Sequence, residues 1–179
     1  KQINIHEGLD STLMLLQGRF QSTLERPAIQ VIKQYATLPQ LECLAGQLNQ
    51  VFMNILSNAV DALEDRFDTQ QVTTLQGAKA QIPIIHIQTT VPKPGWVQIT
   101  IADNGLGMPE AVRENLFIPF YTTKPVGKGT GLGLSISYQI ICDHHQGRLN
   151  CVSTPGVGTT FMIEIPVGLD NIDADLANQ

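Results

Sequence analysis

Charged residues are scarce in this 179-residue sequence: they make up 15% of the chain, against about a quarter in ordinary soluble domains. The apolar fraction of 42% argues against a disordered chain, a coiled coil or a nucleic-acid-binding tail. Basic residues are also few, since eleven Lys and Arg face sixteen Asp and Glu and give a formal net charge of −5. This balance excludes a general polyanion binder, and we expect no nucleic-acid partner.

Long apolar runs and cysteine pairs are missing as well. No uninterrupted apolar run approaches the length of a membrane span and no signal peptide opens the chain, so we expect no membrane insertion. Cys43, Cys142 and Cys151 show no CxxC or Cys/His ligand spacing, which favours reduced thiols in a cytoplasmic protein. Because Lys1 is not a methionine, we expect the chain to be a piece of something longer.

The apolar pattern predicts one domain at residues 1–167, followed by an acidic, flexible tail at 168–179. Asn4 is placed to cap a helix, and Glu7 completes a capping box. Residues 66–80 are polar without a sustained period and are interpreted as a loop. Helices are predicted at 4–20, 45–63, from about 109, and at 131–144; strands are predicted at 29–35, 41–43, 82–91, 96–102, 148–153 and 159–167.

The order of these elements predicts the fold class. Hairpin turns are expected at 92–95 and 155–156, and the strands and helices interleave irregularly rather than as βαβ units. Such a sequence favours an α+β sandwich of two layers, with helices on one face of a mixed β-sheet.

A polar stripe marks the helix predicted at 45–63. Asn54, Asn58 and Asp61 stand at i, i+4 and i+7, on one narrow face opposite the apolar face. A solvated face would favour Glu, Lys or Gln over these poor helix formers. Amide and carboxylate oxygens in a row suit a hard cation such as Mg²⁺, so the stripe predicts a binding surface.

Two glycine-rich segments follow. Asp103 continues the inward parity of its strand, so its buried carboxylate needs a donor from a nearby turn or a ligand amino group. Residues 122–133 alternate glycines before a helix and include Lys124 and Lys128, which predicts an anion site. The spacing matches neither a Walker A loop nor a Rossmann fingerprint.

Together these segments resemble the ATP-binding domain of sensor histidine kinases, in the GHKL superfamily. Residues 54–63 resemble the N box, 103–108 the first glycine box, 116–124 the F box and lid, 129–134 the second glycine box, and 158–161 the final glycine motif. Five boxes occur in family order over about 110 residues. The resemblance implies a mixed sheet backed by helices, with ATP held between the N-box helix and a mobile lid.

The resemblance also implies residue roles. Asp103 would take the adenine amine, with Gly105 and Gly107 lining its pocket. Asn58 would bind Mg²⁺ and Asn54 would support the phosphates. Asn54, Asn58, Lys124 and Lys128 form the implied catalytic set. The remaining implied nucleotide contacts are Met108, Phe120, Thr123, Gly129, Thr130, Gly131, Leu132, Gly133 and Thr159.

Asp61 departs from the family pattern, and Asn54 discriminates between classes within the superfamily. Asp61 stands where many members carry Lys or Arg, so it acts on Mg²⁺ through water or is structural. Asn54 replaces the Glu that activates water in gyrase- and HSP90-like ATPases, and an amide is no base at neutral pH.

We therefore expect a kinase that passes the ATP γ-phosphate to a histidine on a separate dimerisation domain, with a response-regulator receiver domain as a further partner. This fragment is expected to be a cytoplasmic monomer. Three alternatives stay open: a GHKL ATPase, disfavoured by Asn54; an anti-sigma-factor serine kinase, disfavoured by the long lid; and a nucleotide-sensing module without phosphotransfer.

Overall fold

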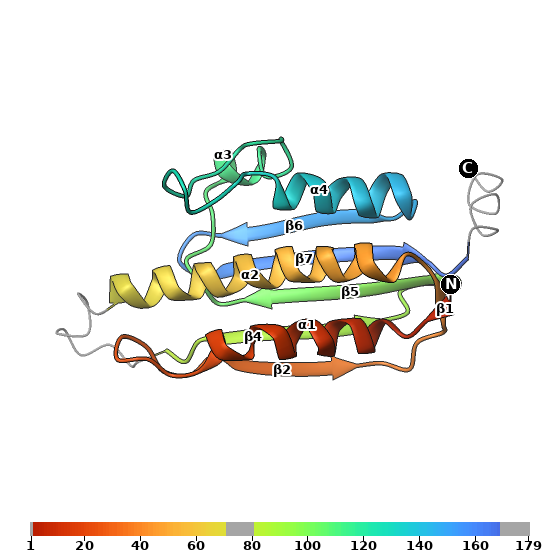
Figure 1. The fold of residues 1–179 in the computed structure, drawn as a ribbon, viewed down its shortest axis with the longest axis horizontal. Helices are drawn as coiled ribbons and strands as arrows, with labels where there is room; N and C mark the ends of the chain where they lie inside the picture. The colour runs from red at the N-terminus through yellow and green to blue at the C-terminus, as the bar shows by residue number, and fades with distance from the viewer. Residues whose placement is uncertain (1, 71–80, 169–179) are drawn as a thin grey trace.

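A computed structural model describes residues 2–70 and 81–168, which form two layers (Figure 1). One mixed sheet has the strand order β2-β4-β5-β7-β6, with β2 and β4 parallel and the other neighbours antiparallel. Its strands are β2 (Gln30–Tyr35), β4 (Ile84–Thr90), β5 (Trp96–Asp103), β6 (Arg148–Thr154) and β7 (Gly158–Pro166). The helices are α1 (Ile5–Phe20), α2 (Ala45–Gln70), α3 (Glu110–Arg113) and α4 (Gly133–Gln139), which continues as the π-helix η2 (Ile140–His144). A short antiparallel pair, β1 (Gln2–Ile3) and β3 (Leu41–Glu42), completes the described elements.

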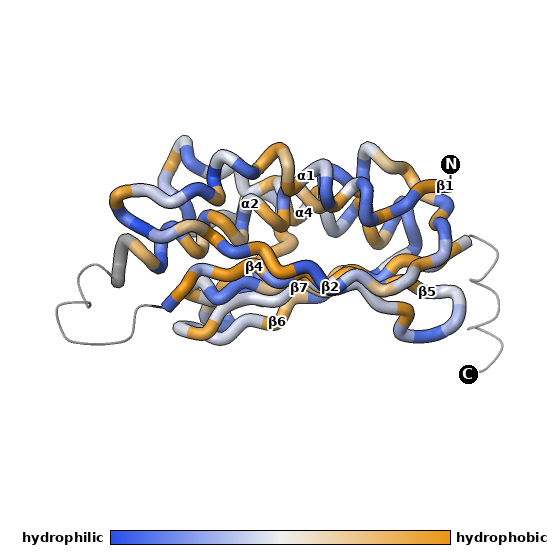
Figure 2. Tube along the Cα trace, turned by 90° about the horizontal axis from the view of Figure 1, so that it is seen from below, coloured by the Kyte–Doolittle hydropathy of each residue, from blue (hydrophilic) through white to orange (hydrophobic). Residues whose placement is uncertain are grey.

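The core lies between the sheet and the helices, which gather on one side of it (Figure 2). In β5, Val97, Ile99 and Ile101 are buried and alternate with partly exposed residues, as expected for a strand with one covered face. The apolar stripe of α2 supplies the facing layer, for example Phe52 and Ile55. The predicted α+β two-layer architecture is confirmed.

Two details of the predicted fold are wrong. The loop expected at 66–80 starts late, because α2 continues to Gln70 and buries Phe67 one turn beyond Leu63; residues 71–80 lie outside the described residues. A strand–helix–strand crossover exists as well, since β2 and the parallel β4 lie on either side of α2 in the chain. The short strand β3 lies between β2 and α2 in the chain, so the sequence does not show the simple strand–helix–strand order of such a crossover.

Helix ends also differ from expectation. The Asn4 side chain accepts from the N–H of His6 at 3.0 Å, rather than from Glu7 as a capping box requires. The last predicted helix starts at Gly133 instead of 131, and ends in the wider π-helix. The tail predicted at 168–179 lies outside the described residues from 169 onward.

Candidate functional site

A cleft of about 410 Å³ opens between α2, the turn after β5 and the segment 121–131. We call this segment the lid. The floor of the cleft is formed by the polar stripe of α2 and by the end of β5, both of which the sequence pattern had indicated. The residues that line the cleft are Asn54, Ser57, Asn58, Ala59, Asp61, Ala62, Asp65, Asp103, Leu106, Gly107, Met108, Val112, Leu116, Tyr121, Thr122, Thr123, Lys124, Gly129, Thr130, Gly131, Gly133, Leu134, Thr159 and Phe161.

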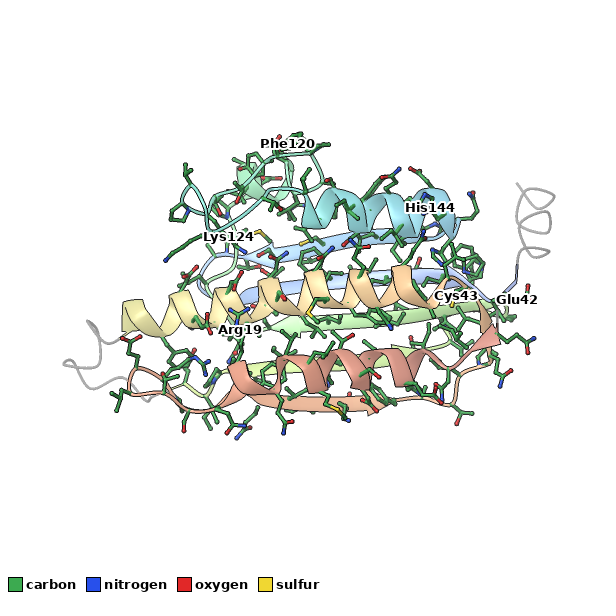
Figure 3. The ribbon with its side chains drawn as sticks, viewed as in Figure 1. Arg19, Glu42, Cys43, Phe120, Lys124 and His144 are labelled. Carbon is green, nitrogen blue, oxygen red and sulfur yellow. The ribbon has the colours of Figure 1, made fainter. Side chains whose placement is uncertain are left out.

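The polar stripe of α2 reaches across the cleft to the lid and to α4. The Asn54 amide donates to the Gly133 carbonyl oxygen at 2.9 Å and to the Ser137 hydroxyl at 3.1 Å, so it fixes the first turn of α4 on α2. Lys124 of the lid donates from Nζ to the Asp61 carboxylate and, at 3.4 Å, to the Asn58 amide oxygen. The lid therefore rests on α2 through one lysine (Figure 3).

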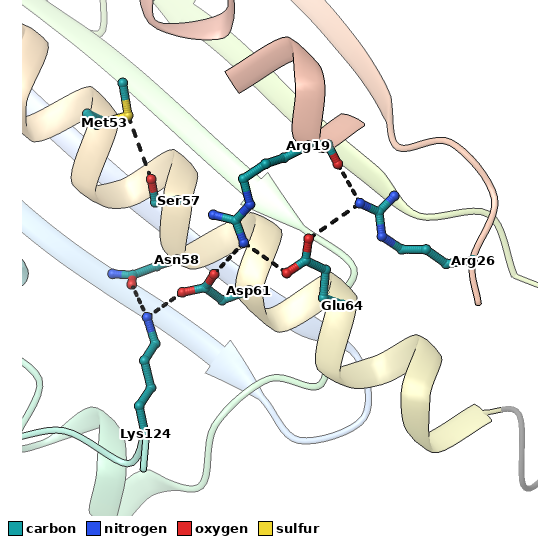
Figure 4. A network of polar contacts seen from close by, with 8 residues as sticks. All are labelled: Arg19, Arg26, Met53, Ser57, Asn58, Asp61, Glu64 and Lys124. Atoms are coloured by element: carbon teal, nitrogen blue, oxygen red, sulfur yellow. Dashed lines mark hydrogen bonds and ion pairs between the residues drawn. The ribbon is translucent and has the colours of Figure 1, made fainter. Parts of the chain in front are cut away.

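Asp61 lies between two cations (Figure 4). Arg19 of α1 donates to Asp61 Oδ1 at 2.6 Å and to Glu64 Oε2 at 2.8 Å, on the side of α2 away from Lys124. Burial alone would raise the pKa of Asp61, but the hydrogen bonds from Arg19 and Lys124 outweigh it and hold that pKa below its ordinary value. Asp61 is thus an ionised bridge between α1 and the lid.

Asp103 forms the other wall of the cleft. Its Oδ1 accepts from the Gly105 N–H at 2.8 Å. Burial raises the pKa of Asp103 to about 6, against the lowering influence of the Gly105 and Thr159 backbones and of the Arg66 charge. A carboxylate with unused acceptor capacity at the wall of a cleft is suited to a ligand that brings N–H donors.

The two ends of the lid are in close contact with each other. Gly131 has a φ of +69°, and a Cβ on it would lie 2.4 Å from the Phe120 carbonyl carbon, so the two lid ends meet where only glycine fits. Phe120 itself has a φ of +67° and its ring is largely exposed (Figure 3). Lys128 is exposed at the outer part of the lid.

Most of the residues predicted for the site come together in this cleft. Asn54, Asn58, Asp61, Asp103, Lys124 and Thr159 line it, as do Gly107, Met108, Thr123, Gly129, Thr130, Gly131 and Gly133. Four predicted residues lie elsewhere. Gly105 is buried behind Asp103 against Ala62, Phe120 and Lys128 face solvent, and Leu132 is partly buried at the N-cap of α4.

Comparison with known proteins identifies this arrangement. Residues 44–169 match the family model described as histidine kinase-, DNA gyrase B- and HSP90-like ATPase. The chain belongs to this ATPase family. The matched range begins just before α2 and includes Asp61, Asp103 and the lid.

Its curated relatives are sensor histidine kinases. The sensor kinase CckA of Brucella abortus is 39% identical over 134 residues, covering 73% of this chain and 13% of that protein. The histidine kinase/phosphatase NtrB of Rhizobium leguminosarum bv. phaseoli is 33% identical over 170 residues, covering 94% of this chain and 42% of that protein. The chain therefore spans well under half the length of these relatives.

Solved histidine kinase domains share the fold. The catalytic domain of histidine kinase ThkA is 25% identical, with a TM-score of 0.70 over 93% of this chain and 97% of that one. A structure of ThkA in complex with the response regulator TrrA, 22% identical, gives a TM-score of 0.68 over 94% of this chain and 42% of that one. Among the helices that the structure describes, none combines the length and apolarity needed to cross a membrane.

Sequence reasoning missed two arginines of this ATPase domain. Arg19 was not singled out because its partners, Asp61 and Glu64, lie more than forty positions away in the sequence. Arg66 was assigned to a loop, although it follows the cleft residue Ala62 by one helical turn. Extending the helical pattern by that turn would have aligned Arg66 with Ala62 and Asn58.

Proposed function

We propose that residues 1–167 are the catalytic domain of a sensor histidine kinase that binds Mg²⁺–ATP and passes the γ-phosphate to a histidine on a separate helical dimerisation domain. The observation that carries this proposal is the cleft itself. It gathers a buried carboxylate, an amide–carboxylate stripe and a lid lysine around one volume, in a chain of the ATPase family.

The two ends of the cleft suit the two ends of ATP. Asp103 accepts the exocyclic amine of adenine, because its carboxylate is buried and keeps acceptor capacity beyond the Gly105 bond. Lys124 and Lys128 of the lid bind the phosphates through their positive charges. Phosphoryl transfer needs positioning and charge neutralisation more than covalent chemistry from the protein, and these residues supply both.

The donor set of α2 fits Mg²⁺. The Asn58 amide oxygen and the Asp61 carboxylate both accept from one ammonium, that of Lys124, so they already face a cation. Hard oxygen donors of this kind suit Mg²⁺, which neutralises phosphate charge when bound. Within residues 2–70 and 81–168, no three His, Cys, Asp or Glu side chains gather as metal ligands, so Asn58 and Asp61 would hold the ion together with phosphate oxygens and water.

Asn54 favours a kinase over an ATP hydrolase. Its amide nitrogen donates to Gly133 and Ser137, and an amide cannot take a proton from water. The side chain therefore orients the second glycine box on α2 and leaves ATP unhydrolysed until a histidine arrives.

The proposed role also implies a partner and a cellular location for the domain. ThkA, of the same fold, has been crystallised with a response regulator, which supports a receiver domain as the downstream partner. A cytoplasmic location and a monomeric fragment belong to this proposal, and the three cysteines, none of which forms a disulfide, fit a reducing compartment.

The test uses the chain with γ-labelled ATP, with and without Mg²⁺ and a separately produced histidine-bearing helical domain. We expect Mg²⁺-dependent ATP binding, little label on the chain alone, and acid-labile label on the added domain. Asn58→Ala should weaken Mg²⁺-dependent binding by about tenfold, the usual size of losing one ligand to a bound ion, and remove most of the transfer.

The matched control is Asn150→Ala, which makes the same change on an exposed strand residue outside the cleft. Phosphate release that ignores the added domain would point to an ATPase instead. Binding without transfer would point to a nucleotide-sensing module, and the absence of binding would overturn the proposal.

A further inference from the structure

The turn that follows β5 is held from two sides. On the side of β4, the Asn104 side chain accepts from the Ile84 N–H at 2.7 Å and donates to the Ile82 carbonyl oxygen at 2.8 Å. On the side of α2, Arg66 donates from Nη1 to the carbonyl oxygens of Asn104 at 2.5 Å and Gly105 at 2.9 Å. The turn is therefore clamped between a strand and a helix.

Arg66 is itself fixed for this task. Its Nη2 donates to Gln81 Oε1 at 2.5 Å, so both terminal guanidinium nitrogens are engaged. One turn earlier on the helix, Ala62 packs against Gly105 so closely that a Cβ on that glycine would lie 2.7 Å from the Ala62 Cβ. Nη1 donates to the two adjacent carbonyls while Nη2 holds Gln81, and the rigid plane of the guanidinium fixes these directions relative to one another.

We propose that Arg66 is a positioning residue for the base of the nucleotide: its guanidinium fixes the Asn104 and Gly105 carbonyls, and thereby the Gly105 N–H that orients the Asp103 carboxylate. This inference rests on the proposed function, because it assigns Asp103 to adenine. Arg66 does not line the cleft, and it positions the carboxylate through the turn.

The charge of Arg66 adds a second effect on the same carboxylate. Burial raises the pKa of Asp103, and the positive charge of Arg66 is one of the influences that oppose this rise. Other charged or titratable groups around Asp103 are Asp61 and Asp65 on α2, Lys124 in the lid and Cys151 on β6. Losing the guanidinium charge raises the pKa of Asp103 toward neutrality, where a protonated carboxyl accepts poorly.

Two variants separate orientation from charge. Arg66→Lys keeps the charge and loses the planar guanidinium, whereas Arg66→Gln keeps a hydrogen-bond donor and loses the charge. Arg148→Gln is the matched control, because it removes the same charge at the start of β6, at the opposite end of the strand from the cleft (Figure 1). Thermal unfolding of each variant verifies that it is folded.

Two measurements are made on each protein between pH 5 and 8. The first is the titration of the Asp103 carboxyl in the ligand-free chain by nuclear magnetic resonance. The second is the affinity for adenosine, which probes the base without phosphates. We expect Arg66→Gln to raise the Asp103 pKa and to weaken adenosine by up to about tenfold, most strongly at the acid end of the range, because the turn loses its clamp and the carboxylate loses a charge that favours its ionised form.

The other expectations complete the test. Arg66→Lys should leave the Asp103 pKa near that of the parent and weaken adenosine several-fold at every pH, because the two carbonyls lose the planar guanidinium that holds them. Arg148→Gln should match the parent. Adenosine affinities equal to the parent in both Arg66 variants would overturn the inference, and an unchanged Asp103 pKa in Arg66→Gln would overturn the charge effect. If the parent itself fails to bind adenosine while the Asp103 pKa still responds to Arg66, the proposed function fails and the link between Arg66 and Asp103 stands.

Discussion

The ionised carboxylate of Asp103 destabilises the folded chain. Its pKa rises from 3.8 to about 6, so the folded chain holds this proton more tightly than the unfolded chain does. Stability linked to this group is highest below about pH 4 and falls as the pH rises to about 6, reaching a loss of about 3 kcal/mol above it. This cost is consistent with the proposed role of Asp103 in binding the adenine amine.

Replacing Asp103 by Asn should therefore separate stability from binding. Asn keeps an oxygen for the Gly105 N–H and carries no charge. We expect Asp103→Asn to raise the free energy of unfolding at pH 7.5 by about 1–3 kcal/mol and to gain little at pH 4. ATP affinity should fall at least about tenfold, because a donor then meets the adenine amine. Urea unfolding at both pH values and a nucleotide titration measure these effects; an equal change in stability at both pH values would contradict the buried-charge explanation.

Among the elements, the lid has the fewest anchors. Val126 is fully exposed, and Lys124 holds the lid to α2. Ordering each further residue costs roughly 1–2 kcal/mol, whereas each charged hydrogen bond to phosphate returns about 1.5–3 kcal/mol. We therefore expect the part of the lid beyond Lys124 to become ordered on α2 only when a triphosphate is bound.

Trypsin can test this closure at one bond. Lys124 is followed by Pro125, which blocks cleavage, so the Lys128–Gly129 bond is the useful site. We expect Mg²⁺ with a non-hydrolysable ATP analogue to slow its cleavage, and adenosine, which fills only the Asp103 end, to leave it unchanged. Equal cleavage rates with and without the analogue would remove the assigned role of Lys128.

At the scale of the whole molecule, three free thiols report on separate regions: Cys43 beside β3, Cys142 in η2 and Cys151 in β6. Burial raises the pKa of Cys43 to about 11 and that of Cys151 to about 12, and raises that of Cys142 as well. Because the thiolate is the reactive form, we expect Cys43 and Cys151 to react with dithionitrobenzoate at pH 8 more than about a hundredfold more slowly in the native chain than in urea. Fast reaction in the native chain would show that the two layers open locally.

The sequence predicted the parts of the molecule that depend on local pattern. Alternation marked β5, the 3.6-residue period marked the apolar face of α2, and the polar stripe of Asn54, Asn58 and Asp61 anticipated one wall of the cleft. What it missed depends on contacts between distant residues. Arg19 contacts Asp61 across 42 positions, which leaves no period to detect. The helical period could have placed Arg66 on the face of Asn58 and Ala62, but not its contact with Asn104, 38 positions away.

Buried histidine gives a further example of this limit. His145, directly after the helix predicted at 131–144, is a polar residue with no period to mark it as part of the core, yet it is 6% exposed. Its Nε2 accepts from the Leu44 N–H at 3.1 Å, and its Nδ1 lies 2.8 Å from the Ile140 carbonyl oxygen. The ring links η2 to the residue just before α2, a contact that only the folded chain reveals.

The Lys124–Asp61 contact gives the polar stripe of α2 a counterion from the lid. Charge on this side of the cleft is therefore balanced within the protein itself. A triphosphate that engages Lys124 must take it from Asp61, so binding exchanges one ion pair for another rather than adding charge to the cleft. The observed affinity is then the intrinsic affinity reduced by the fraction of molecules in which the lysine is free. Asp61 keeps its contact with Arg19 during this exchange, and a ligand that occupies only the Asp103 end does not have to compete for the lysine.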